Sequence, residues 1–276
     1  MAANMMFRRM AVSGAALLLA GWMAAAQPGA RSNRGPLPIG FHTGETLRYD
    51  VRWKPVFMLP SIHAGDMTLR VSALEEFRGR KAYRVQVEAI STGLLPKMAG
   101  IEVRNFYESI FDAETLCSLR LVKRTREGDR KRDVELDIDP DGGTSAFVEY
   151  DSGVAPRKLI RRETFSNQPR CAIDIVSSFY VARTLDFKTG STQKLILNDD
   201  GVIRELSVAV PRMEVVAAAE RKFQTFQIET RSGLGGMFKD KGAFTVWYAT
   251  DSGRIPVRFE AKVAIGRVFG RLVKVG

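Results

Sequence analysis

Apolar and polar residues alternate along most of this 276-residue chain, in short runs separated by turn residues. In the first run, Leu47, Tyr49, Val51 and Trp53 are each followed by a polar residue. A period of two places successive side chains on opposite faces of a strand, so that one face is buried. Further strands are expected near 67–71, 83–89, 102–111, 117–126, 131–139, 144–150, 154–163, 191–199, 202–210, 222–231, 243–250, 255–264 and 266–275. Short connections between consecutive strands favour an antiparallel meander.

One stretch, residues 171–184, breaks this pattern. Ile173, Val176 and Tyr180 fall on one helical face, with further apolar residues beside it, and Asp174 is placed where a helix start prefers an acid. We therefore expect one buried amphipathic helix. The predicted fold class is all-β: a strongly curved antiparallel sheet or a partly closed β-barrel, with this helix inside it or across its mouth.

The first 26 residues have the pattern of an export signal. Arg8 and Arg9 precede an apolar run, 10–23, and three alanines end at Ala26. We expect a signal peptide at 1–26, a flexible Pro/Gly/Arg-rich leader at 27–43 and a single β-rich domain at 44–276. Retention of the signal as a membrane anchor remains the alternative to cleavage. The predicted location is the periplasm or outer envelope of a bacterium, with the protein soluble after cleavage.

The chain is basic. Loss of Arg8 and Arg9 with the signal lowers the formal net charge from +11 to +9. In an exported protein a basic surface favours anionic envelope components such as lipid headgroups, not nucleic acid. Peripheral membrane contact is one interpretation, and a merely solvated basic surface is the other.

The two cysteines, Cys117 and Cys171, predict one disulfide, because the compartment is oxidising. It would join the start of a strand to the start of the helix. Two free buried thiols are the alternative.

Recognisable catalytic and metal-binding patterns are missing from the sequence. The two histidines, His42 and His63, do not stand in a zinc-binding or triad pattern. Residues 137–142 resemble half of a calcium loop, but Pro140 interrupts it and Val148 stands where the last acid belongs. A plain turn explains that stretch. We therefore expect no metal, no cofactor and no catalytic residue, and a protein that is not an enzyme.

Three connections are unusually apolar for exposed turns. They join the first and second strands, the third and fourth, and the two strands near 222–231 and 243–250. Adaptable apolar rims suit lipid-like ligands or membrane surfaces, whereas turns folded inward would serve as core plugs. The predicted ligand-binding rim consists of Phe57, Met58, Leu59, Leu94, Leu95, Met98, Leu234, Met237 and Phe238.

Four segments, taken in order, resemble one bacterial family. They are GETLRYDVRW at 44–53, AGD at 64–66, DIVSSFYVAR at 174–183 and WYATDSGRIPV at 247–257. The chain resembles the domain of unknown function 3108 family over about residues 44–275. The resemblance implies an exported, β-rich envelope protein without an established activity, and it supplies no catalytic residues.

The leading functional hypothesis is a non-enzymatic envelope protein that holds a lipid-like apolar molecule within its curved sheet. A structural or assembly factor that docks on an envelope protein partner is the second hypothesis. A hydrolase with a site unreadable from sequence is the third.

Overall fold

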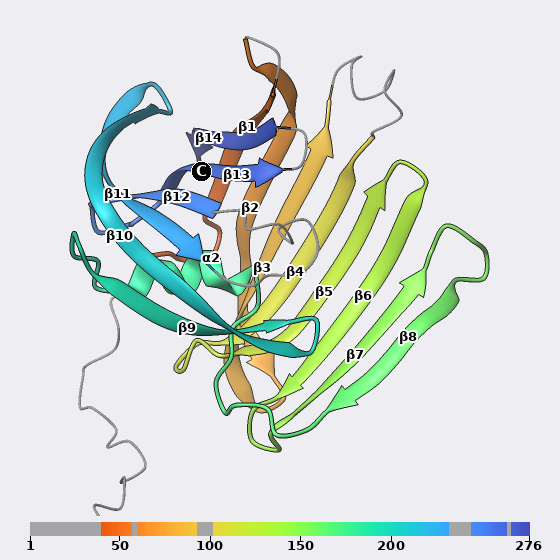
Figure 1. The fold of residues 1–276 in the computed structure, drawn as a ribbon. Helices are drawn as coiled ribbons and strands as arrows, with labels where there is room; N and C mark the ends of the chain where they lie inside the picture. The colour runs from red at the N-terminus through yellow and green to blue at the C-terminus, as the bar shows by residue number, and fades with distance from the viewer. Residues whose placement is uncertain (1–39, 57–59, 93–101, 232–243, 264–265) are drawn as a thin grey trace, which may run out of the picture. The chain divides into compact units, whose positions relative to one another are not determined.

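The computed structural model describes residues 40–56, 60–92, 102–231, 244–263 and 266–276. They belong to one compact unit, Pro36–Gly276. Its 14 strands form one sheet, and every pairing between them is antiparallel (Figure 1). The strands are β1 (Thr46–Pro55), β2 (Ile62–Phe77), β3 (Arg80–Ser91), β4 (Arg104–Asp112), β5 (Ser118–Glu127), β6 (Arg130–Asp139), β7 (Thr144–Asp151), β8 (Lys158–Phe165), β9 (Thr192–Asp199), β10 (Val202–Ala218), β11 (Arg221–Arg231), β12 (Phe244–Ala249), β13 (Pro256–Val263) and β14 (Gly266–Val275).

Strands that are consecutive in sequence are neighbours in the sheet, with one exception. The order is β8-β7-β6-β5-β4-β3-β2-β1-β14-β13-β12-β11-β10-β9. The first strand thus pairs with the last in the middle of the sheet, while β8 and β9 lie at opposite edges. The expected curved antiparallel sheet is confirmed, and it stays open because β8 and β9 do not pair with each other.

Irregular positions along the strands help the sheet to bend. The β1–β2 register shifts between Val51 and Arg52, next to Gly65. A Cβ on Gly65 would lie 2.1 Å from the carbonyl oxygen of Ile90, so a larger residue cannot stand there. A second shift, between Ala209 and Arg212 of β10, contains Pro211. A residue in a bulge is unpaired, so the missing N–H of Pro211 costs no hydrogen bond between strands. The strand β10 therefore continues to Ala218, whereas the sequence analysis ended it at 210.

The helix is shorter than the expected 171–184. The α-helix α2 spans Ser177–Val181 and continues as a 3₁₀ turn, η1 (Ala182–Thr184). Residues 171–174 stay outside the helix because Ile173 forms a parallel bridge with Leu197 of β9. Its N–H donates to the Ile196 carbonyl at 2.9 Å, and its own carbonyl accepts from the Asn198 N–H at 2.8 Å. These bonds to the sheet replace the first helical turn.

The buried apolar side chains form two large hydrophobic clusters, and residues of the short helix and its flanks belong to both. One contains residues of β1, β2 and β10–β14, together with Ala182 and Phe187. The other contains residues of β2–β7, together with Val176 and Tyr180. Phe41, which precedes the expected domain boundary at residue 44, is buried in this second cluster against Tyr83 and Tyr180.

Candidate functional site

The connection between β8 and β9 carries α2 and crosses the inside of the sheet. We call residues 171–184 the crossing segment. Its start is held between two strands, because the N–H of Ser118 in β5 donates to the Ala172 carbonyl at 2.9 Å while Ile173 pairs with β9. The crossing segment thus bridges strands that are far apart in the sheet order.

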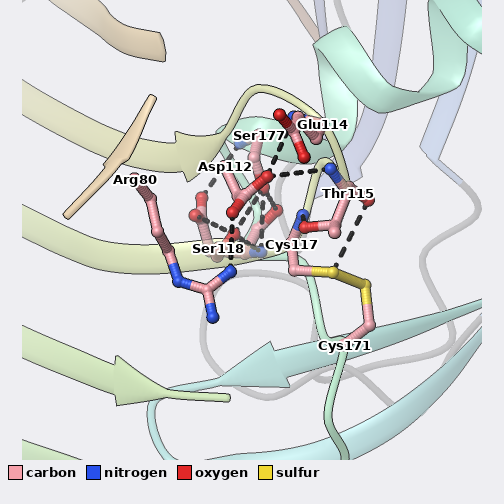
Figure 2. Close-up of a disulfide and its surroundings, with 9 residues drawn as sticks. Arg80, Asp112, Glu114, Thr115, Cys117, Ser118, Cys171 and Ser177 are labelled. Carbon is pink, nitrogen blue, oxygen red and sulfur yellow. Dashed lines mark hydrogen bonds and ion pairs between the residues drawn. A yellow bond between two sulfur atoms is a disulfide. The ribbon is translucent and has the colours of Figure 1, made fainter. Parts of the chain in front are cut away.

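A disulfide fixes the same end covalently. Cys117 and Cys171 are bonded, with their Cα atoms 5.0 Å apart, so the predicted disulfide is confirmed (Figure 2). Beside it, Asp112 accepts from the N–H groups of Glu114 and Thr115, both at 2.8 Å, and from Arg80 at 2.8 Å. Burial alone would raise the pKa of Asp112, but the bonds from Thr115 and Arg80 outweigh it and hold the pKa below its usual value. The turn that carries Cys117 is therefore itself firmly bonded.

A fully buried carboxylate organises the entry to α2. Asp174 Oδ2 accepts from the hydroxyls of Ser109 at 2.5 Å and Ser118 at 2.6 Å. Its Oδ1 accepts from the N–H groups of Val176 at 2.7 Å and Ser177 at 2.9 Å. Because four donors surround it, this carboxylate is fully hydrogen-bonded within the protein and joins the entry of α2 to β4 and β5. The arrangement assigns Asp174 a structural role and leaves it little capacity for a ligand.

A buried ion pair holds the other end of the crossing segment. Arg183 is 1% exposed and donates to both carboxylate oxygens of Glu45, at 2.5 and 2.8 Å. It also donates to the carbonyl oxygens of Gly253, at 2.7 and 2.9 Å, and of Gly40. One guanidinium thus ties η1 to the start of β1 and to the β12–β13 turn. A bidentate pair with further bonds is the geometry that lets a charge be buried.

A small cavity with a volume of about 80 Å³ lies between the crossing segment and strands β9–β12. Its walls are mainly apolar and include Ile175, Phe179 and Ala182 from the crossing segment and Leu206, Ile228 and Val246 from β10, β11 and β12. We call it the apolar pocket.

Three hydroxyl groups also line the apolar pocket, and each donates its proton within the protein. Ser178 donates to the Ile175 carbonyl at 2.7 Å, Thr230 to that of Phe244 at 3.0 Å, and Tyr248 to that of Phe179 at 3.2 Å. Burial raises the pKa of Tyr248, so its phenol stays protonated. With these donors already used, the apolar pocket suits a hydrocarbon group better than a polar one.

On the outer face of the sheet, Asp50, His63 and Thr92 are hydrogen-bonded in the order acid, histidine, hydroxyl that a catalytic triad has. His63 Nδ1 lies 2.6 Å from Asp50 Oδ1, and its Nε2 lies 2.8 Å from Thr92 Oγ1. His63 is 42% exposed, and the Thr92 N–H already donates to the Ala64 carbonyl at 3.2 Å. Acyl transfer also needs donors for a developing oxyanion, and the N–H of Thr92 is already used in its bond to Ala64.

One protein family matches most of the chain. The model of a protein family of unknown function, DUF3108, matches residues 48–273. The chain belongs to the DUF3108 family. No curated protein matches its sequence.

Solved structures resemble this DUF3108 protein at low sequence identity. A β-barrel-like protein of the DUF1849 family from Brucella abortus has a TM-score of 0.54 and 11% identity, covering 85% of this chain and 97% of its own. This likeness supports the fold alone. A candidate exported protein with a YmcC-like fold from Bacteroides fragilis (TM-score 0.36, 11% identity) and a candidate lipoprotein from Parabacteroides distasonis (0.33, 10%) each cover 85% of this chain and 96% of their own.

The segments by which the sequence resembles DUF3108 supply the structural anchors. Glu45, Asp174, Arg183 and Gly253 lie in three of them, and Gly65, with its close backbone approach, lies in the fourth. Sequence alone does not pair Glu45 with Arg183, because 138 positions separate them. The apolar pocket had a clearer signal, since Ile175, Phe179 and Ala182 are the further apolar residues beside the helical face of Ile173, Val176 and Tyr180, although the sequence predicted only their burial.

The predicted rim residues Phe57, Met58, Leu59, Leu94, Leu95, Met98, Leu234, Met237 and Phe238 all lie outside the described residues. The strand ends that flank them are described. Because alternate strands of an antiparallel sheet run in the same direction, β1, β3 and β11 all end at the same end of the sheet. Thr230 and Phe244, which precede and follow the third connection, line the apolar pocket.

The half-calcium pattern at 137–142 forms an ordinary turn. Asp139 Oδ1 accepts from the N–H groups of Asp141 and Gly142, at 3.1 and 2.9 Å. Asp137 and Asp141 pair with Arg78 and Arg80. Across the described ranges, no group of three or more His, Cys, Asp or Glu side chains is arranged to hold a metal ion, and no helix is long and apolar enough to cross a membrane.

Proposed function

We propose that this DUF3108 protein is a non-enzymatic envelope protein that binds the hydrocarbon chain of a lipid-like molecule in the apolar pocket. The observation that carries the proposal is the pocket's chemistry: apolar walls, with the hydroxyls of Ser178, Thr230 and Tyr248 all donating inside the protein. A polar headgroup would find few donors there, so it stays outside.

The size of the apolar pocket limits how much of a chain enters. Its volume of about 80 Å³ is smaller than the cavity of roughly 150 Å³ that accommodates benzene in an engineered protein. The end of a hydrocarbon chain fits, and deeper insertion requires α2 to move away from β9–β12. Each buried methylene contributes about 0.8 kcal/mol, so a short insertion gives weak, reversible binding.

An envelope location is part of the proposal. Its support is the signal pattern at 1–26 and the Cys117–Cys171 disulfide, which persists in oxidising compartments.

Lipid extraction and a direct binding assay test the proposal. Purified protein is extracted for lipid mass spectrometry, and delipidated protein is titrated with dansyl-undecanoic acid. Ser178→Phe, which fills the apolar pocket, is expected to abolish the fluorescence increase. Val215→Phe, at a position of β10 that is 59% exposed, should leave it unchanged. Clean extracts together with no probe uptake would overturn the proposal.

A separate experiment tests the proposal that the protein is not an enzyme, at the Asp50–His63–Thr92 group on the outer face. Hydrolysis of p-nitrophenyl butyrate that disappears in His63→Ala, with the fold retained, would contradict it. We expect equal background rates in both proteins.

A further inference from the structure

The two edges of the sheet are finished differently. At β9 the crossing segment covers part of the edge, because Ile173 makes two backbone hydrogen bonds to that strand. At β8 no described strand pairs with the edge that faces away from β7. An open edge presents unpaired N–H and C=O groups that can accept another strand.

The side chains of β8 are exposed and combine apolar with cationic character. Leu159 and Ile160 are 46% and 47% exposed. Lys158 and Arg162 are also exposed, and neither forms an ion pair with any residue the structure describes. Arg161, in contrast, is neutralised by a two-pronged contact with Glu163, both distances being 2.5 Å. The strand therefore carries two uncompensated positive charges along an open edge.

We propose that β8 is a docking edge for an extended acidic segment of another envelope protein, which adds to the sheet as one further strand. Backbone hydrogen bonds to β8 would supply affinity, Leu159 and Ile160 would contact apolar side chains of the added strand, and Lys158 and Arg162 would select acidic ones. The inference is independent of the apolar pocket, which lies in the other half of the sheet.

Two other occupants fit these observations less well. A second copy of the chain would bring two strands of the same surplus charge together, which is unfavourable. A lipid bilayer would leave the backbone groups of the edge without hydrogen-bond partners, at several kcal/mol for each group in the hydrocarbon region. An acidic strand satisfies both the charges and the backbone.

The test uses two fluorescein-labelled peptides of about ten residues, long enough for one strand. One alternates Glu and Val, and the other alternates Lys and Val. Binding to the full-length protein is followed by fluorescence anisotropy. We expect the acidic peptide to bind and the basic one not to bind. The double variant Lys158→Glu with Arg162→Glu should weaken acidic-peptide binding by at least about tenfold.

A matched control changes charge equally at a distance from the edge. Lys81→Glu with Lys222→Glu alters two exposed lysines on β3 and β11 and should change the affinity by less than about twofold. Hydrogen exchange adds a readout that charge alone does not move, because strand addition protects β8 amides that exchange rapidly in the free protein.

Several outcomes would overturn the inference. Equal weakening by both double variants would mean unspecific attraction, and absence of new protection in β8 would exclude strand addition. Dimerisation that depends on Lys158 and Arg162, seen by sedimentation, would assign the edge to a second copy. Binding through these residues to vesicles of phosphatidylcholine with phosphatidylglycerol, without peptide binding, would assign it to a membrane.

Discussion

The crossing segment contacts the sheet in two different ways. At its ends the contacts are covalent, ionic or fully bonded polar groups: the Cys117–Cys171 disulfide, the Asp174 carboxylate and the Arg183–Glu45 pair. Along the flank that faces β9–β12 the contacts are apolar and leave a pocket. A helix of five residues is far below the length at which isolated helices become stable, so it depends on its anchors. Firm ends allow one flank to remain incompletely packed.

Breaking the ion-pair anchor should have the largest effect. Arg183→Met leaves the Glu45 carboxylate buried without its partner, which costs about 3–5 kcal/mol. The free energy of unfolding from urea denaturation measures the loss. The double variant Glu45→Leu with Arg183→Met removes both charges and should be more stable than the single variant. A double variant less stable than Arg183→Met would show that the uncompensated charge is not the cause.

Removing the covalent anchor ranks second. Replacing Cys117 and Cys171 together by Ser should lower the free energy of unfolding by about 2–4 kcal/mol, because the bond closes a long loop. Uptake of dansyl-undecanoic acid at moderate temperature should persist, since the sulfurs do not line the apolar pocket. Thermal unfolding and probe titration report the two effects. Two reactive thiols in the denatured, unreduced wild-type protein would refute the bond.

A pair of identical substitutions compares the anchored stretch with the pocket flank directly. Ile173→Val shortens a side chain that is 5% exposed in the anchored stretch and should cost about 0.5–1.5 kcal/mol. Ile175→Val shortens a half-buried side chain beside existing space and should cost less. Urea midpoints of the two variants give the comparison. Equal costs would mean that the two stretches are packed equally tightly.

The smallest effect is expected for a hydroxyl on the closed flank of α2. The Tyr180 hydroxyl is buried without a hydrogen-bond partner in the described structure, and burial raises the pKa of this side chain. Tyr180→Phe should therefore leave the melting temperature unchanged or raise it slightly. Tyr49→Phe is the control, because its hydroxyl donates to the Pro256 carbonyl at 2.6 Å, and it should cost about 1 kcal/mol. A loss of stability for Tyr180→Phe larger than that for Tyr49→Phe would reveal a hydrogen-bond partner for the Tyr180 hydroxyl.

Local patterns predicted the strands well, and long-range contacts explain the rest. Alternation indicated most strands because these have one face toward the core, whereas β8 is largely exposed and was indicated by the turn before it. The helix was expected to begin at 171, whereas the bridge from Ile173 to Leu197 keeps that stretch extended. Such a bridge has no local signal. The same holds for the contact of Glu45 with Arg183.

The candidate site was predictable in part. The apolar residues Ile175 and Phe179 predicted that this side of the helix is buried, but not that it lines a pocket, and the Cys117–Cys171 bond followed from the compartment. The sequence did not predict that β10, β11 and β12 complete the pocket. The helix interrupts the run of neighbouring strands, so the sequence does not indicate where the strands after it lie relative to the helix. The ligand-binding role of the nine rim residues in the three apolar connections stays a prediction, because they lie outside the described residues.

The pairing of β1 with β14 has a consequence for biogenesis. The last of the fourteen strands in chain order sits in the centre of the finished sheet, where Thr46 and Gly276 exchange two backbone hydrogen bonds at 2.9 and 2.8 Å. A nascent chain stopped before β14 would hold two half-sheets, each with a bare strand where the other belongs. Completion of the sheet therefore waits for β14, because no other strand joins the two halves.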